Sequence, residues 1–177
     1  MRLGSLILVA LIVLAIAFVT APWWTFRSLR DAARTEDGPS LSKMIDYDSV
    51  RDGLAAQLSG EPPPAPPPNI WSDPMGALKH MFTKPPTPPA QTERYVAAKA
   101  IADMADGLPP GAPLPPSNKE PFPTIAFWGP DRCRITVADP ANKARKTEFT
   151  FQRRGIFVWK LVRIVMPGRP AVRAVAG

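Results

Sequence analysis

The chain has 177 residues, with 22 Lys and Arg against 15 Asp and Glu, and 24 of its residues are proline. This length fits one small domain with attached segments. A single cysteine, Cys133, and a single histidine, His80, disfavour a disulfide framework, a Cys/His metal site and a Cys–His catalytic pair. Because 45% of the residues are apolar, the chain is not wholly disordered. We expect no cofactor and no bound metal.

An uncharged stretch, residues 3–26, lies near the start of the chain. As a helix, its most apolar part, residues 3–21, would span about 28 Å, close to the roughly 30 Å of a bilayer core. We therefore predict a transmembrane signal anchor over residues 1–24 that contacts lipid through residues 3–21. The alternative is a cleaved signal peptide with a small-x-small site at Val19-Thr20-Ala21, which Pro22, directly after the site, disfavours.

The orientation of this helix depends on two opposing signals. Arginines after the span outnumber the positive charges before it, which favours a cytoplasmic domain. A signal anchor with a two-residue tail usually behaves in the opposite way, and acidic residues interleave these arginines. We expect a single-pass protein of the inner membrane with a periplasmic domain, and the cytoplasmic side stays open. Four residues are expected at the membrane surface: Trp23, Trp24, Arg27 and Arg30.

Residues 25–60 form the predicted helical part of the domain. Phe26, Leu29 and Ala33 recur at helical spacing, so the helix that leaves the membrane has one apolar side. Ser40 is predicted to cap a short helix, and Asp48 to cap the next one. The second of these helices is expected to end at Gly60.

Residues 61–123 contain 18 of the prolines and are predicted to be linkers with two short helices, about 74–82 and 93–106. The run 62–68 predicts a polyproline II spacer of roughly 20 Å. Thr92 is expected to cap the helix over 93–106, and Gly107 to end it.

Residues 124–167 are predicted to form an antiparallel β-meander, followed by a flexible tail over 168–177. Apolar and polar residues alternate in the expected strands, and the phase changes at Val162-Arg163, which predicts a bulge there. Cys133 falls on the apolar face, where a buried, inert thiol is expected. Helices followed by a meander indicate an α+β fold, a cone-like roll with the helices on the apolar face of the sheet. The expected strands are 124–128, 132–138, 146–153 and 156–166.

Two parts of the sequence resemble a bacterial family of unknown function whose members are short, single-span envelope proteins. The first runs from Pro22-Trp23-Trp24 through Leu29-Arg30-Asp31-Ala32 to Ile45-Asp46-Tyr47 and Leu54, and the second from Phe149 to Pro167. The resemblance implies a membrane-anchored small domain and brings no assigned activity. The roll is also similar to the cone fold of nuclear-transport-factor-two-like proteins, which says little about function.

Asp46, Tyr47 and Asp48 form a tight acidic and phenolic cluster. Cone folds place such groups in a pocket, where a carboxylate with a raised pKa can act as a general base. The structural alternative is that the aspartates cap helices or form ion pairs while the tyrosine packs. His80 is expected to be a surface residue between proline tracts.

Basic residues concentrate in residues 124–177, which carry eleven Lys and Arg against three Asp and Glu. A positive sheet face attracts anionic lipid, an acidic protein or nucleic acid. Nucleic acid is unlikely as the partner, because the aromatic residues of these strands are predicted on the opposite face. The alternative role of the charges is solubility. The cations expected on or beside this face are Arg132, Arg134, Lys146, Arg153, Arg154, Lys160 and Arg163.

Taken together, these features predict a non-catalytic binding or interaction module of the bacterial envelope, anchored in the membrane. Two alternatives stay open. One is a small pocket enzyme, a hydrolase or isomerase that uses Asp46 or Tyr47; the other is a proline-rich structural tether. The sequence leaves the oligomeric state and the ligand open.

Overall fold

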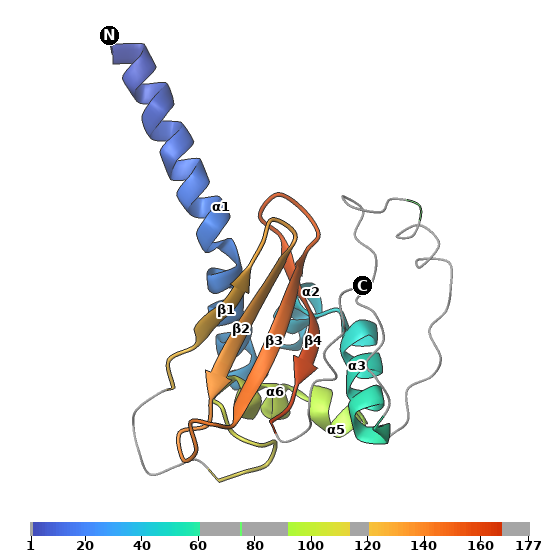
Figure 1. Cartoon of the computed structure of the whole chain (residues 1–177). Coiled ribbons are helices and arrows are strands. Elements are labelled where there is room, and N and C mark those ends of the chain that lie inside the picture. Colours follow the sequence, from blue (N-terminus) through green and yellow to red (C-terminus); the bar gives the residue numbers. More distant parts are fainter. Residues whose placement is uncertain (1, 61–74, 76–91, 114–120, 168–177) are drawn as a thin grey trace, which may run out of the picture.

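The computed structural model describes residues 2–60, 75, 92–113 and 121–167. An N-terminal apolar helix, further helices and a four-stranded antiparallel sheet confirm the predicted α+β class (Figure 1). The predicted spacer at 62–68, His80 and the tail at 168–177 lie outside the described residues, as does the helix predicted near 74–82 except for Met75. The helices are α1 (Arg2–Arg34), α2 (Gly38–Met44), α3 (Tyr47–Ser59), α5 (Glu93–Val96) and α6 (Ala98–Ala105).

Helix α1 has two parts with different surroundings. Residues 5–17 are exposed and project from the domain, and the helix is long and apolar enough to cross a membrane. Farther along, Phe26, Leu29 and Ala33 are buried, as their spacing predicts. A signal sequence has the same length and composition as such a span. The helix therefore joins an apolar projecting part to a part that belongs to the domain core.

The sheet has the strand order β1-β2-β3-β4, and all neighbouring strands are antiparallel. Strands β1 (Thr124–Trp128), β2 (Arg132–Ala138) and β3 (Lys146–Arg153) have the predicted bounds. Strand β4 (Trp159–Val165) begins three residues later than predicted. Residues 154–158 form a loop, closed by a hydrogen bond of 2.8 Å from Arg154 N to Val158 O. Phe157, predicted to face the core, therefore lies exposed in this loop.

Two irregularities bend the sheet. Thr150 pairs with Arg163 and Phe151 with Leu161, so Val162 is an extra residue in β4. This confirms the bulge that the change of phase predicts. A second bulge interrupts the pairing of β1 with β2 between Ile125 and Phe127. The alternation of residues in the sequence does not predict this bulge.

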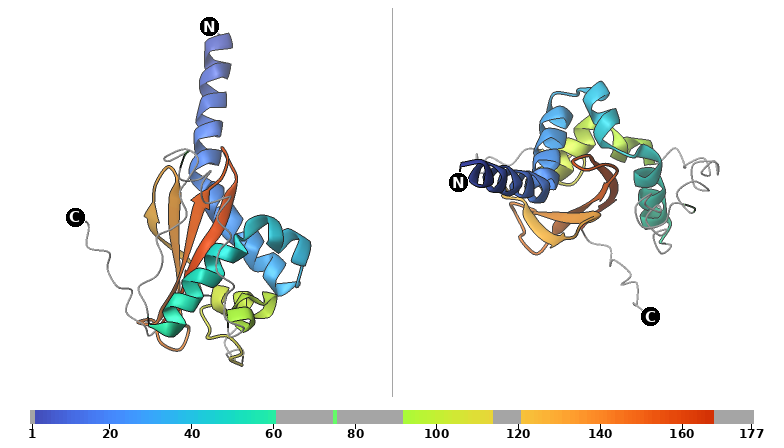
Figure 2. Two further views of the ribbon diagram at one scale, coloured as in Figure 1. Left: turned by 90° about the vertical axis from the view of Figure 1, so that its right-hand side faces the viewer. Right: turned by 90° about the horizontal axis from the view of Figure 1, so that it is seen from above.

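One face of the sheet packs against the helices, and we call it the inner face. Its central residues, Phe149 and Phe151, are fully buried. Phe26 of α1 meets them edge-on, with ring centroids 5.4 and 6.3 Å away. Aromatic pairs with this geometry add stability beyond the area that they bury. Seen from above, α1 and the other helices lie on one side of the sheet and leave the outer face uncovered by any described helix (Figure 2).

The free edge of β4 is covered by the segment from α2 to α3. Ile45 forms a parallel bridge with Leu161, whose carbonyl accepts a hydrogen bond of 2.9 Å from Asp46 N. Farther along, the Gln57 amide donates to Ile164 O at 2.6 Å and accepts from Met166 N at 3.1 Å. The side chain thereby takes the place of a neighbouring strand. An edge covered in this way does not pair with other chains.

The helix caps differ from the predicted ones. Helix α2 is capped by Asp37, whose carboxylate accepts from Ser40 N at 3.2 Å, so the prediction of Ser40 is wrong. Helix α3 is capped by Asp46, which accepts from Ser49 N at 3.3 Å, so the prediction of Asp48 is also wrong. Both helices begin earlier than expected, because Pro39 fits the first turn of α2 and the bridge at Ile45 sets the start of α3. Gly60 ends α3 with a positive φ of 80°, as predicted.

The helix predicted over residues 93–106 is two helices, α5 and α6. Ala97 is extended between them, with ψ 145°, and Thr92 makes no side-chain capping bond. After this bend, α6 packs along α1. At its end Asp106 accepts hydrogen bonds from Arg30 at 2.7 Å and from Arg34 at 2.8 Å. Gly107 ends the helix with φ 76°, as predicted.

Candidate functional site

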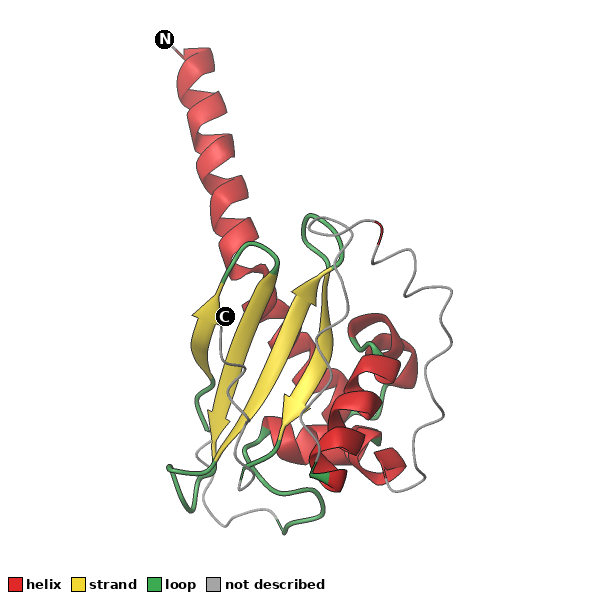
Figure 3. Ribbon diagram, turned by 45° about the vertical axis from the view of Figure 1, so that its right-hand side comes forward, coloured by secondary structure: helices red, strands yellow, loops and turns green. Residues whose placement is uncertain are grey.

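Four of the seven predicted cations lie together on the outer face of the sheet, which Figure 3 shows with the helices behind it. The register places Arg132 and Lys160 on either side of Gln152, and Arg134 and Arg163 on either side of Thr150. These side chains form two adjacent rows across strands β2, β3 and β4. We call this group the cationic face: Arg132, Arg134, Lys160 and Arg163.

Like charges on the cationic face perturb one another. Burial lowers the pKa of the Arg163 guanidinium, and the positive charge of Arg132 lowers it further, whereas Glu148 raises it. Glu148 also lies 3.8 Å from Arg134. Gln152 in the first row is almost fully buried although it points outward.

The other three predicted cations lie elsewhere. Lys146 begins β3, at the opposite end of the sheet from Arg132. Arg153 is buried on the inner face, where its guanidinium carbon lies 3.7 Å from the ring centroid of Phe18 and 4.8 Å from that of Trp159. Arg154 forms an ion pair of 3.1 Å with Asp46. Sequence alternation therefore assigns the cations of β2 and β4 to one face and does not distinguish these three.

Of the residues predicted at the membrane surface, two are exposed and two have partners in the domain. Trp24 and Arg27 are exposed. The Trp23 ring packs against Phe122, with centroids 5.6 Å apart. Arg30 is buried in its ion pair with Asp106 and is not at the surface, because it lies on the side of α1 that meets α6.

Exposed apolar side chains gather at one end of the sheet, and the sequence analysis does not predict this group. The β1–β2 turn and the β3–β4 loop both lie at the end from which α1 projects, here called the near end (Figure 1). Ile156, Phe157 and Val158 of the loop are 62%, 44% and 53% exposed, and Trp128 before the turn is 37% exposed. The run Gly-Ile-Phe-Val at 155–158 contains residues of high strand propensity. The sequence therefore predicts a strand there and not a loop.

The side chains of the acidic and phenolic cluster are engaged with a helix end and with arginines. Asp46 caps α3 and pairs with Arg154, and Asp48 is exposed, 3.9 Å from Arg51. Tyr47 stacks beside Arg51, 5.4 Å from its guanidinium. Burial raises the pKa of the Tyr47 phenol, and the charge of Arg51 lowers it. These contacts correspond to the structural alternative for the cluster.

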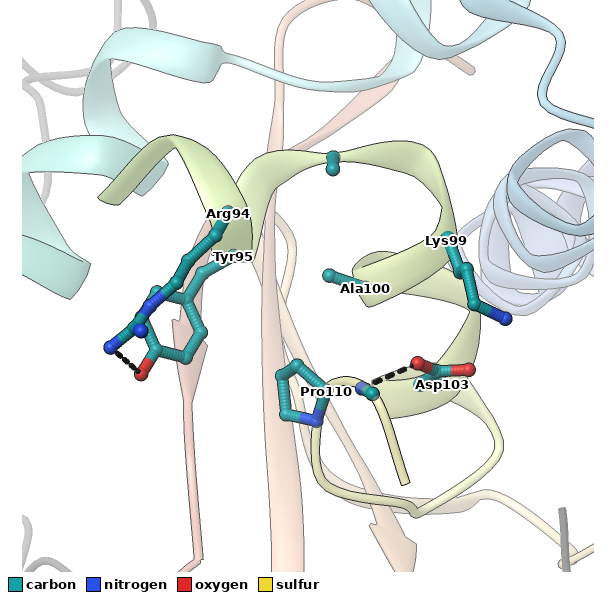
Figure 4. Close-up of a pocket in the computed structure, with 8 residues that line it drawn as sticks. Arg94, Tyr95, Lys99, Ala100, Asp103 and Pro110 are labelled. Carbon is teal, nitrogen blue, oxygen red and sulfur yellow. Dashed lines mark hydrogen bonds between the residues drawn. The ribbon is translucent and has the colours of Figure 1, made fainter. Parts of the chain in front are cut away.

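An open depression of about 480 Å³ lies at the bend between α5 and α6 (Figure 4). Its polar side chains are engaged with one another or with the backbone. Arg94 donates to the Tyr95 hydroxyl at 3.0 Å, and Asp103 accepts from Gly111 N at 2.8 Å. Lys99 lies across the depression from Arg94, and its side chain points away from Arg94 and Tyr95 (Figure 4). The lining residues of the depression include no member of the cationic face or of the cluster at Asp46.

Cys133 is buried on the inner face, and burial raises its pKa to about 11. The thiolate is the reactive form of cysteine, so this thiol is inert at neutral pH. Within the described ranges, no three His, Cys, Asp or Glu side chains come together as a metal site would need.

The fold and these surfaces define a class: a small α+β domain on an apolar N-terminal helix that can be a membrane anchor or a signal sequence. The family model of a protein of unknown function, DUF2939, matches residues 11–104, and the chain belongs to this family. The match covers the helices and ends before the sheet, so the cationic face lies outside it. No curated protein and no solved structure matches the chain. The likeness to the cone fold stays a prediction.

Proposed function

We propose that this protein is a membrane-anchored interaction module of the bacterial envelope and that its cationic face binds an acidic segment of a partner protein. The observation that carries the proposal is the arrangement of Arg132, Arg134, Lys160 and Arg163 in two adjacent rows. Glu148 is a single carboxylate beside these four cations. Such a field speeds the approach of an anionic partner and orients it.

The position of the cationic face favours a protein over the lipid surface as its partner. The strands are oblique to the projecting part of α1, and the near end of the sheet lies on the side from which that part projects, so the outer face rises from a membrane that α1 crosses (Figure 1). Headgroups occupy only about 5–7 Å beyond each side of the hydrocarbon core. Arg134 lies two residues farther from the near end than Arg132, or about 7 Å, so its row is the one more open to a partner in solution.

The surroundings of Arg134 and Arg132 also fit a binding surface. The guanidinium of Arg134 lies 5.3 Å from the ring of Phe127, which is itself exposed on the outer face. Aromatic residues and arginine are enriched at protein interfaces. Arg132 is half-buried and lies in the adjacent row of the same face.

The test is a titration of the full chain in nanodiscs of phosphatidylcholine with a fluorescent oligoglutamate peptide. The double variant Arg134→Glu/Lys160→Glu should weaken binding at least about tenfold at low salt, where surface charges are least screened. Lys143→Glu/Arg145→Glu is the matched control, because it changes the net charge equally on exposed residues of the β2–β3 loop. We expect the control to bind the peptide within about twofold of the wild type.

Equal losses in both double variants would show that net charge alone attracts the peptide, and would overturn the proposal. Absence of binding by the wild type would also overturn it and would leave lipid headgroups as the anionic partner. Circular dichroism of each variant confirms that the sheet is retained. The periplasmic location is part of the proposal, and a reporter fused after Gly177 that is active only in the periplasm tests it.

A further inference from the structure

We propose that the near end of the sheet, with Trp128 and the loop residues Ile156, Phe157 and Val158, inserts into the surface of the bilayer that α1 crosses. The domain is then attached to the membrane at two points, the helix and the β3–β4 loop. The inference rests on the membrane anchoring in the proposed function and is independent of any acidic partner.

The sheet touches α1 within the uncharged stretch of the helix. Phe18 lies in that stretch, and its ring meets the Trp128 ring edge-on at a centroid distance of 6.4 Å. On the same ring lies the guanidinium of Arg153, the last residue of β3 before the loop. The level of Phe18 along the helix is therefore also the level of the near end.

The length of the helix places this level inside the membrane. Arg2 is charged, so the span begins at Leu3. A spanning helix needs about 20 residues and therefore extends to Pro22. Phe18 lies four residues before Pro22, or about 6 Å at 1.5 Å per residue. A helix perpendicular to the bilayer thus brings the near end into the boundary between acyl chains and headgroups.

The chemistry of the near end suits this boundary. Three consecutive apolar side chains, Ile156, Phe157 and Val158, are exposed at the tip of the loop. Burial of apolar surface in lipid is favourable, and aromatic rings are enriched at the depth of the headgroups. Arg153 carries a positive charge at this level, which the charge of Asp131 in the β1–β2 turn partly offsets.

The neighbouring charges agree with the same placement. Arg132 and Lys160 each lie within two residues of the near-end loops, on the outer face. Cations beside an apolar tip strengthen its attraction to an anionic membrane surface, while the second row, which includes Arg134, lies farther from the tip. Arg154, in the loop itself, is drawn away from the tip by its ion pair with Asp46. The tip is thereby left apolar.

The test measures depth with nitroxide labels on the full chain in nanodiscs that contain phosphatidylglycerol. Three single variants carry the label: Phe157→Cys at the near end, Ala144→Cys in the exposed β2–β3 loop at the opposite end, and Val13→Cys in the projecting part of α1. The native Cys133 is buried and does not take up the label at neutral pH. Relative accessibility to oxygen and to a water-soluble nickel complex gives the depth.

We expect the label at residue 157 to lie about 5–10 Å below the headgroup surface. The label at 144 should be in water and the label at 13 in the hydrocarbon core. A label at 157 that is as accessible to nickel as the label at 144, with 13 in lipid, would overturn the docking and leave the anchor intact. A label at 13 in water would overturn the anchor and the docking together. Peptide binding to the cationic face enters none of these results.

Discussion

The two ends of the sheet present opposite surfaces. At the end away from the projecting helix, the β2–β3 loop over 139–145 is polar and satisfies its own backbone. Asp139 N donates to Arg145 O at 2.8 Å, and the Asp139 carboxylate accepts from Ala141 N at 2.8 Å. At the near end, the β3–β4 loop has one such bond, from Arg154 N to Val158 O, and an exposed apolar tip.

This difference shows what each loop is adapted to contact. A loop that saturates its polar groups internally and exposes charged side chains is stable in water. A loop that exposes three consecutive apolar side chains gains from contact with lipid or with another protein. Because both loops belong to one meander, the strands determine which end each loop occupies, and α1 projects from one of these two ends.

The first prediction, with the largest effect, separates core from surface among the phenylalanines. Phe149→Ala should reduce the free energy of unfolding by about 3–5 kcal/mol, because it empties a buried site against Phe26. Phe157→Ala should change it by about 1.5 kcal/mol or less, because this side chain has no contact with the core and loses only its contact with lipid. Denaturant unfolding of the full chain in nanodiscs measures both. Equal losses would place the near-end loop in the core and remove the contrast between the two ends.

The second prediction concerns the turn that packs on the end of the sheet away from the projecting helix. Gly107 has a φ of 76°, and a Cβ there would lie 2.3 Å from Ala138 O. Gly107→Ala should therefore cost about 2–3 kcal/mol, from both strain and displacement of the strand end. Gly111→Ala is the matched control, with φ 80° and open space around it, and should cost about 1 kcal/mol. Thermal melts compare the two, and similar losses would show that this packing contributes little.

The third prediction is the smallest and concerns Cys133, which pairs with Trp128 in the register at the near end. Its pKa is raised from 9.0 to about 11, so between these values the folded thiol keeps a proton that the unfolded thiol has lost. Stability should therefore fall as the pH rises from 9 to 11, and more in the wild type than in Cys133→Ala. Alkylation by iodoacetamide should be negligible at pH 8. Rapid alkylation there would show that the near end is open toward the core.

Local pattern was sufficient for most of the sheet. Strands β1, β2 and β3 have the bounds that alternation predicts, because side chains in a strand point alternately to the two faces whatever the rest of the chain does. Gly60 and Gly107 end their helices as predicted, because glycine has no Cβ and adopts a positive φ without steric strain. The apolar part of α1 is likewise predicted from consecutive residues alone, because it depends only on their hydropathy.

Features that depend on distant partners were not available from local pattern. Ala97 breaks the predicted helix where α6 meets α1, and Asp46 begins α3 where its backbone bonds to Leu161. Arg30 looked like a membrane-surface residue, but Asp106 binds it from 76 residues away. Each outcome is decided by a contact across the fold, which no window of neighbouring residues contains.

The features of the candidate site also fall into those predicted from the sequence and those set by contacts across the fold. The sequence by itself determined that cations concentrate after residue 124 and that an apolar helix precedes the domain. Only the tertiary structure decided that four cations form two adjacent rows, that Arg153 contacts Phe18, and that Ile156 to Val158 lie at the end from which the helix projects. The reason is physical: charge and hydropathy are carried by single residues, whereas a surface exists only once strand register and helix packing bring distant residues together.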